Sequence, residues 1–160
     1  MRTLDRAIRS YKKELKELIQ KYEEELNNSG FELIYYKLTE LSKGRMYNLI
    51  TAFTALLLKN NINPLEYTSY IPARFAYELD IEDFVIPNNI TYIGEYAFGY
   101  CESLTSITIP KKVKFIASKA FFRCDRLKDV YYEGSKEDWK NIKIEDDNDE
   151  LLTANIHYNS

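Results

Sequence analysis

The chain has 160 residues, of which 45% are hydrophobic and 29% charged, and its net charge is −3. This composition is typical of a globular protein and excludes disorder over most of the length. Residues 1–69 carry 11 Lys/Arg against 9 Asp/Glu, whereas residues 70–160 carry 11 against 16, a balance that argues against sequence-independent nucleic-acid binding.

No run of apolar residues is long enough to cross a membrane, since the longest candidate, residues 49–58, is interrupted by threonines. The charged N-terminus lacks the apolar segment of a signal peptide. The sequence therefore predicts a cytoplasmic protein without a membrane-spanning segment. Its two cysteines, Cys101 and Cys124, are expected to be reduced there.

The first expected element is a long helix over residues 3–27. Its apolar residues recur at alternating steps of four and three, at Leu4, Ile8, Tyr11, Leu15, Leu18 and Tyr22. This seam predicts packing against another helix, either in the same chain or, through residues 4–26, in a second copy. Because the seam lasts only about three heptads, it is marginal for an isolated coiled coil.

Two further helices are expected before residue 66. Ser29 and Glu32 have the spacing of a capping box, and Gly44 suits the residue that follows a helix. A wide apolar face between residues 45 and 60 predicts a third, buried helix, which Asn63-Pro64 ends. Residues 1–66 are thus expected to form a helical domain of three helices, packed against the C-terminal part of the chain.

From residue 70 onward the sequence repeats with a period of 23 residues. Six positions of one copy match six of the next, namely Ile93, Ala97, Phe98, Cys101, Leu104 and Ile107 with Ile116, Ala120, Phe121, Cys124, Leu127 and Val130. The same shift aligns Phe75, Ile81, Phe84 and Ile86 with Phe98, Leu104, Ile107 and Ile109, while Tyr70, Arg74 and Glu78 break the pattern. The sequence predicts two good repeats after one degenerate terminal repeat.

The segment Ile93–Pro110 reads Ile-Gly-Glu-Tyr-Ala-Phe-Gly-Tyr-Cys-Glu-Ser-Leu-Thr-Ser-Ile-Thr-Ile-Pro. It resembles the BspA-type leucine-rich repeat family, and the resemblance extends over roughly residues 70–160. The next copy departs from the motif by carrying Ala117 in place of Gly94. The resemblance implies a last strand at Tyr131-Tyr132, a capping helix around Trp139 that begins at Ser135 and Asp138, and a closing strand over residues 154–158.

Together these features predict an α+β fold, in which the three-helix unit caps a short solenoid of about 23-residue leucine-rich repeats over residues 67–160. A single repeat cannot bury its apolar side, so stacked repeats share one core. Leu104, Ile107 and Ile109 are expected to point inward, and Phe98 and Phe121 to stack one repeat apart.

Candidates for chemistry have simpler structural explanations. Cys101 and Cys124 occupy equivalent inward positions, where either a disulfide or two buried thiols would fit, and the resemblance favours the thiols. His157 is the single histidine and is interpreted as an exposed side chain at a strand end. The acidic run over residues 145–150 is expected to be a solvated loop. No catalytic residues, metal ligands or cofactor-binding motif are predicted.

The sequence therefore favours a non-enzymatic protein-interaction module that binds on its outward strand face. The expected partner-binding residues are Glu82, Asp83, Val85, Thr105, Ser106, Thr108, Lys128, Asp129 and Tyr131. Basic residues cluster in the second good repeat, at Lys111, Lys112, Lys114, Lys119, Arg123, Arg126 and Lys128. They are interpreted mainly as a solvated surface, with docking of an anionic partner as the alternative.

Three more specific hypotheses concern the partner. The resemblance suggests a small phage-type intracellular inhibitor of a host enzyme or defence system. Self-association through the first helix is the structural alternative. Nucleic-acid binding would use basic residues of the first helix, namely Arg2, Arg6, Arg9, Lys12, Lys13 and Lys16, and is weakened by the neighbouring Glu14 and Glu17.

Overall fold

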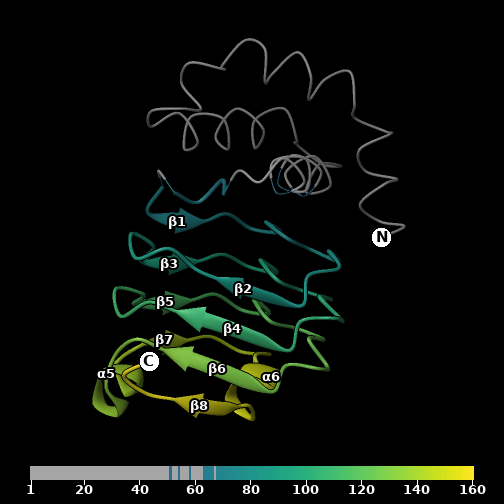
Figure 1. Cartoon of the computed structure of the whole chain (residues 1–160). Coiled ribbons are helices and arrows are strands. Elements are labelled where there is room, and N and C mark those ends of the chain that lie inside the picture. The colour runs from purple at the N-terminus through teal and green to yellow at the C-terminus, as the bar shows by residue number, and fades with distance from the viewer. Residues whose placement is uncertain (1–50, 52–53, 55–57, 59–62, 67) are drawn as a thin grey trace.

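The computed structural model describes residues 51, 54, 58, 63–66 and 68–160. From residue 70 the chain winds through successive turns, each of which contributes one strand to each of two parallel sheets (Figure 1). The first sheet has the order β1 (Tyr70–Ile71), β3 (Tyr92–Ile93), β5 (Phe115–Ile116) and β7 (Lys143–Ile144). The second has the order β2 (Asp83–Val85), β4 (Ser106–Ile109), β6 (Asp129–Tyr132) and β8 (Asn155–His157).

The core lies between the two sheets and extends along the stack. Leu104, Ile107 and Ile109 are buried, as the inward pattern predicts. The rings of Phe98 and Phe121 stack one turn apart, with centroids separated by 5.3 Å and planes 9° apart. These contacts confirm the repeat architecture, because equivalent side chains of adjacent turns meet inside the solenoid.

The first turn departs from the expected 23-residue register. Tyr70 pairs with Tyr92 and Ile71 with Ile93, a shift of 22 residues. The backbone agrees, because left-handed φ angles recur at Arg74, Tyr96 and Lys119. Only at β2 does the shift become 23.

The alignment of Phe75 with Phe98 was therefore wrong. Counting 22 residues back from Phe98 gives Ala76, and Phe75 meets the Phe98 ring edge-on, at 6.0 Å and 69°, not in the Phe98–Phe121 stack. Likewise Tyr70 and Arg74 do not break the repeat, because each occupies the position of a counterpart in the next turn. One residue is missing between β1 and β2, and periodicity alone gave no sign of where.

Helix α5 (Lys136–Lys140) begins as the capping pair predicted. The Ser135 hydroxyl accepts from the Asp138 N–H at 3.1 Å, and the Asp138 carboxylate accepts from the Ser135 N–H at 3.0 Å. Trp139 packs edge-on against Tyr132, with ring centroids 5.1 Å apart. The helix is thereby held against the end of β6.

The acidic run is only in part the solvated loop that was expected. Helix α6 (Asp149–Leu152) begins within it, and Asn148 is 1% exposed. The Asn148 side chain accepts from the Phe121 N–H at 3.0 Å and donates to the Ala117 carbonyl at 3.0 Å. Asn148 therefore satisfies backbone groups of the preceding turn, which a further repeat would otherwise pair.

The predicted helices over residues 3–27 and 31–43, and most of the third, lie outside the described residues. Thr51, Thr54 and Leu58 have helical geometry, and the Thr51 hydroxyl donates to the Arg74 carbonyl. Among the residues with described positions, no helix has the length and apolar character that a membrane crossing requires.

Candidate functional site

The outward face of the second sheet is built from two rows of side chains. In-register pairing aligns Asp83, Ser106, Asp129 and Asn155 in one row. It aligns Val85, Thr108, Tyr131 and His157 in the other. Because side chains alternate between the two faces of a strand, both rows point away from the core. We call these two rows, with the adjoining row Glu82, Thr105 and Lys128, the strand face.

The second row carries the exposed apolar surface of the strand face. Val85 is 65% exposed and Tyr131 is 38% exposed. The Tyr131 ring stacks on the His157 imidazole, with centroids 4.8 Å apart and planes at 16°. His157 Nε2 lies 2.9 Å from Asp129 Oδ1, so the imidazole is held by both rows. An aromatic residue fixed in this way presents area to a partner at a low cost in entropy.

All nine residues predicted for partner binding lie on the strand face. The adjoining row is held by backbone hydrogen bonds, because the Thr105 N–H donates to the Glu82 carbonyl and the Lys128 N–H donates to the Thr105 carbonyl. Acidic side chains lie at the β2 end, since Glu82 and Asp83 are both exposed.

Two members of the face, Asn155 and His157, were missed. The interpretation of His157 as an exposed strand-end residue is right about exposure but omits its contacts with Tyr131 and Asp129. Helices α5 and α6 lengthen the last turn, so the shift from Asp129 to Asn155 is 26 residues and not 23. Alternation along the expected closing strand was the signal that places both residues outward.

Comparison with known families settles the class of these turns. The family model described as the BspA type leucine rich repeat region matches residues 68–143 in six copies. Residues 68–143 are a BspA-type leucine-rich repeat region. A solved structure of a leucine-rich cell surface protein from Faecalibacterium prausnitzii A2-165 is 33% identical, with a TM-score of 0.43. The match covers 48% of this chain and 21% of that protein, and no curated protein matches.

The two cysteines of the BspA-type repeats are free and buried, as the thiol interpretation predicted. Cys101 Sγ donates to the Ala76 carbonyl at 3.1 Å, and Cys124 Sγ donates to the Phe98 carbonyl at 3.0 Å. Burial raises the pKa of Cys101 well above its usual value and that of Cys124 to about 12. Because the thiolate is the reactive form, both thiols are poor nucleophiles and act as small core residues.

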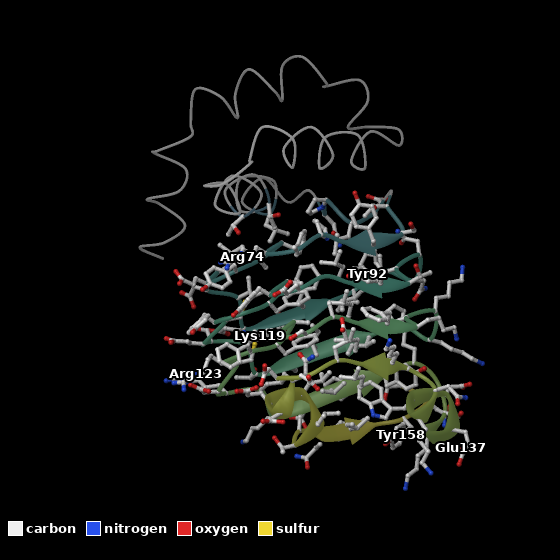
Figure 2. All side chains as sticks on the ribbon, turned by 180° about the vertical axis from the view of Figure 1, so that it is seen from behind. Arg74, Tyr92, Lys119, Arg123, Glu137 and Tyr158 are labelled. Carbon is white, nitrogen blue, oxygen red and sulfur yellow. The ribbon has the colours of Figure 1, made fainter. Side chains whose placement is uncertain are left out.

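Basic residues of the second good repeat are dispersed over the BspA-type region and do not form one patch. Lys111 lies 3.6 Å from Asp138, and Arg123 lies 3.4 Å from Asp125. The Lys119 ammonium sits 5.4 Å from the centroid of the Tyr96 ring. Figure 2 shows Lys119 and Arg123 on the side of the stack away from Glu137 of α5.

Three of these lysines line a groove beside β3 and β5. The groove has a volume of about 640 Å³ and is lined by Asn88, Thr91, Pro110, Lys111, Lys112, Lys114 and Glu133. Within the described part of the chain, no three His, Cys, Asp or Glu side chains gather closely enough to hold a metal ion.

Proposed function

We propose that the BspA-type repeat region is a non-enzymatic module that binds another protein through the strand face. Repeat solenoids of this kind present extended surfaces to partners. The observation that carries the proposal is the row Val85, Thr108, Tyr131 and His157, which exposes an apolar and aromatic strip on a rigid parallel sheet. Tyrosine held at the centre of a polar rim is typical of an energetic anchor in protein interfaces.

The charges on the strand face favour a partner of mixed polarity. Glu82 and Asp83 are acidic at the β2 end, and Lys128 is basic two strands away. Asp129 is already paired with His157. Separated charges of opposite sign select an orientation of the partner, which suits a specific protein surface better than a uniform polyanion.

The strand face is small, which limits what it can bind alone. Adjacent strands lie about 4.8 Å apart, so four strands span only about 14 Å. A standard protein interface buries about 800 Å² per partner. Tyr131 therefore acts as the centre of a larger contact, to which loops beside the strands or residues 1–66 contribute.

Retention of a protein from a bacterial lysate by the immobilised full chain tests the proposal. The variant Thr108→Arg with Tyr131→Ala alters the strand face and is expected to lose the retained protein. Its matched control is Thr91→Arg with Tyr92→Ala, which makes the same changes at exposed positions around β3. A protein retained by both variants would place the interface elsewhere.

The helical domain over residues 1–66 is proposed as a cover for the β1 end of the stack. The supporting contacts come from its described residues. The Thr51 hydroxyl donates to the Arg74 carbonyl, and the Asn89 side chain donates to the Leu65 carbonyl at 2.9 Å. Leu65 is fully buried. Thermal unfolding of residues 67–160 alone, compared with the full chain, tests it, and equal stability would contradict it.

The remaining sequence-based hypotheses are proposals of narrower scope. A phage-type inhibitor of a host enzyme or defence system, with a cytoplasmic location, follows from the family resemblance alone. Self-association through residues 4–26 follows from the helical seam and is the alternative function. Light scattering on the full chain and on a chain lacking residues 1–28 tests that alternative, since a monomer in both cases would contradict it.

A further inference from the structure

The last turn of the stack exposes apolar residues whose counterparts are buried. Ile116 and Val130 are fully buried, whereas their partners in the next strands, Ile144 and Ile156, are only half-buried. Leu152, beside this end, is 50% exposed. The end of the stack is therefore an apolar surface of the kind that each earlier turn covers with the next one.

Strand β8 also forms an open edge of the second sheet. The sheet ends at β8, and Figure 1 shows no described segment beyond that strand. The Asn155 N–H donates to the Lys128 carbonyl on the β6 side. Because backbone groups of successive strand residues point to opposite sides, the N–H and C=O of Ile156 face the open edge. Asn155, Ile156 and His157 include neither lysine nor proline, the residues that commonly protect such an edge.

The charges that flank β8 have opposite signs at its two ends. The acidic run Glu145–Glu150 leads into α6, which precedes the start of β8. Helix α5, which follows the end of the parallel strand β6, carries the exposed Lys136 and Lys140 against a single exposed acidic residue, Glu137. Figure 1 shows α5 and α6 at opposite ends of the second sheet.

We propose that two copies of this chain associate through antiparallel pairing of their β8 strands about a two-fold axis at Ile156. In this arrangement each Ile156 exchanges two backbone hydrogen bonds with its symmetry mate. The rotation brings the acidic α6 end of one copy against the lysine-bearing α5 end of the other, twice per dimer. Such a closed, isologous contact is the commonest form of homo-oligomer.

The dimer has a consequence for the surface beside it. Pairing at β8 joins the two second sheets into one of eight strands, which spans about 34 Å at the usual strand spacing. His157 of each copy then lies next to the junction, and the two Tyr131 rings lie on the same face. The association itself stands on the edge, the apolar end and the charges, and does not depend on the proposed protein-binding function.

Sedimentation velocity of the full chain tests the proposal with a pair of charge reversals. The wild type, with a monomer mass of 18.9 kDa, is expected to show a concentration-dependent dimer that weakens as salt is raised. Lys140→Glu and Asp149→Lys each place like charges together and are expected to raise the dimer dissociation constant about tenfold. The double variant restores the opposite charges and is expected to return the constant close to that of the wild type.

Hydrogen exchange at Ile156 separates this contact from any association through the first helix. Its amide is expected to become more protected as protein concentration rises, while that of Tyr92, in the first sheet, does not change. A monomer at every concentration up to about 1 mM, the upper range of weak association, overturns the proposal. A dimer that ignores both single reversals overturns it as well, as does a double variant that fails to recover.

Discussion

Replacement of Gly94 by alanine tests how closely the turns of the stack approach one another. A Cβ atom at Gly94 would lie 2.6 Å from the Ile71 oxygen and 2.6 Å from the Ala73 nitrogen. Both are backbone atoms of the preceding turn, so a side-chain rotation cannot relieve the contact. The Gly94 N–H also donates to the Ile71 carbonyl at 2.8 Å, and moving the strands apart would lengthen that bond.

Overpacking of this kind costs about 1–3 kcal/mol, and the rigid neighbours place Gly94→Ala at about 2–3 kcal/mol. For a protein of this size the melting temperature should fall by about 4–12 °C. The fluorescence of Trp139, the single tryptophan, reports on the repeat region and can follow thermal and urea unfolding.

The equivalent position in the next turn supplies the matched control. The Ala117 N–H donates to the Ile93 carbonyl at 2.9 Å, as Gly94 does to Ile71, yet Ala117 carries its Cβ without displacement of the strands. Ala117→Gly is expected to cost no more than about 1 kcal/mol, through added freedom of the unfolded chain. If Gly94→Ala is as stable as the wild type, the stated packing of the first two turns is wrong.

Three further predictions concern the second half of the chain. Tyr132→Phe should leave the free energy of unfolding unchanged or raise it by about 1 kcal/mol, because the buried Tyr132 hydroxyl has no partner among the described residues; a clear loss in urea unfolding would reveal a partner. Cys124, whose pKa burial raises from 9.0 to about 12, should react slowly with a disulfide reagent at pH 8 and rapidly in denaturant, and the stability that its neutral thiol contributes should be lost as pH rises from about 9 toward 12. Ser135→Ala should cost about 1 kcal/mol and raise the pKa of Asp138, which hydrogen bonds from Ser135 now hold below its usual value; an unchanged Asp138 titration in NMR spectra would contradict the capping geometry.

The sequence carried enough information to predict the repeat core. Inward residues such as Ile107 and Phe121 are fixed by an apolar pattern that recurs at a constant shift, and stacking turns that shift into contacts. The same pattern placed both cysteines inside the stack. Outward residues of β4 and β6 followed directly, because alternation along a strand leaves no choice of face once the inward residues are known.

Features that break the period could not be predicted from it. The missing residue before β2 moved the first turn by one position, so Phe75 was matched to Phe98 in place of Ala76. The short strand β7 lies in the inserted last turn, where no repeat guides the alignment. Asn148 looked like part of a charged loop, and its role depends on carbonyls and amides of a turn 27 to 31 residues earlier.

The central claim is that the strand face meets another protein, and site-specific photo-crosslinking tests it most directly. A photoreactive phenylalanine in place of Thr108 would lie beside Tyr131 in the exposed row, and one in place of Thr91 would lie near β3 at a comparably accessible position. The account predicts that, in cells that contain the partner, the position 108 probe gives a single heavier adduct and the position 91 probe gives none. Adducts from position 91 alone would show that the partner binds elsewhere and would contradict the account.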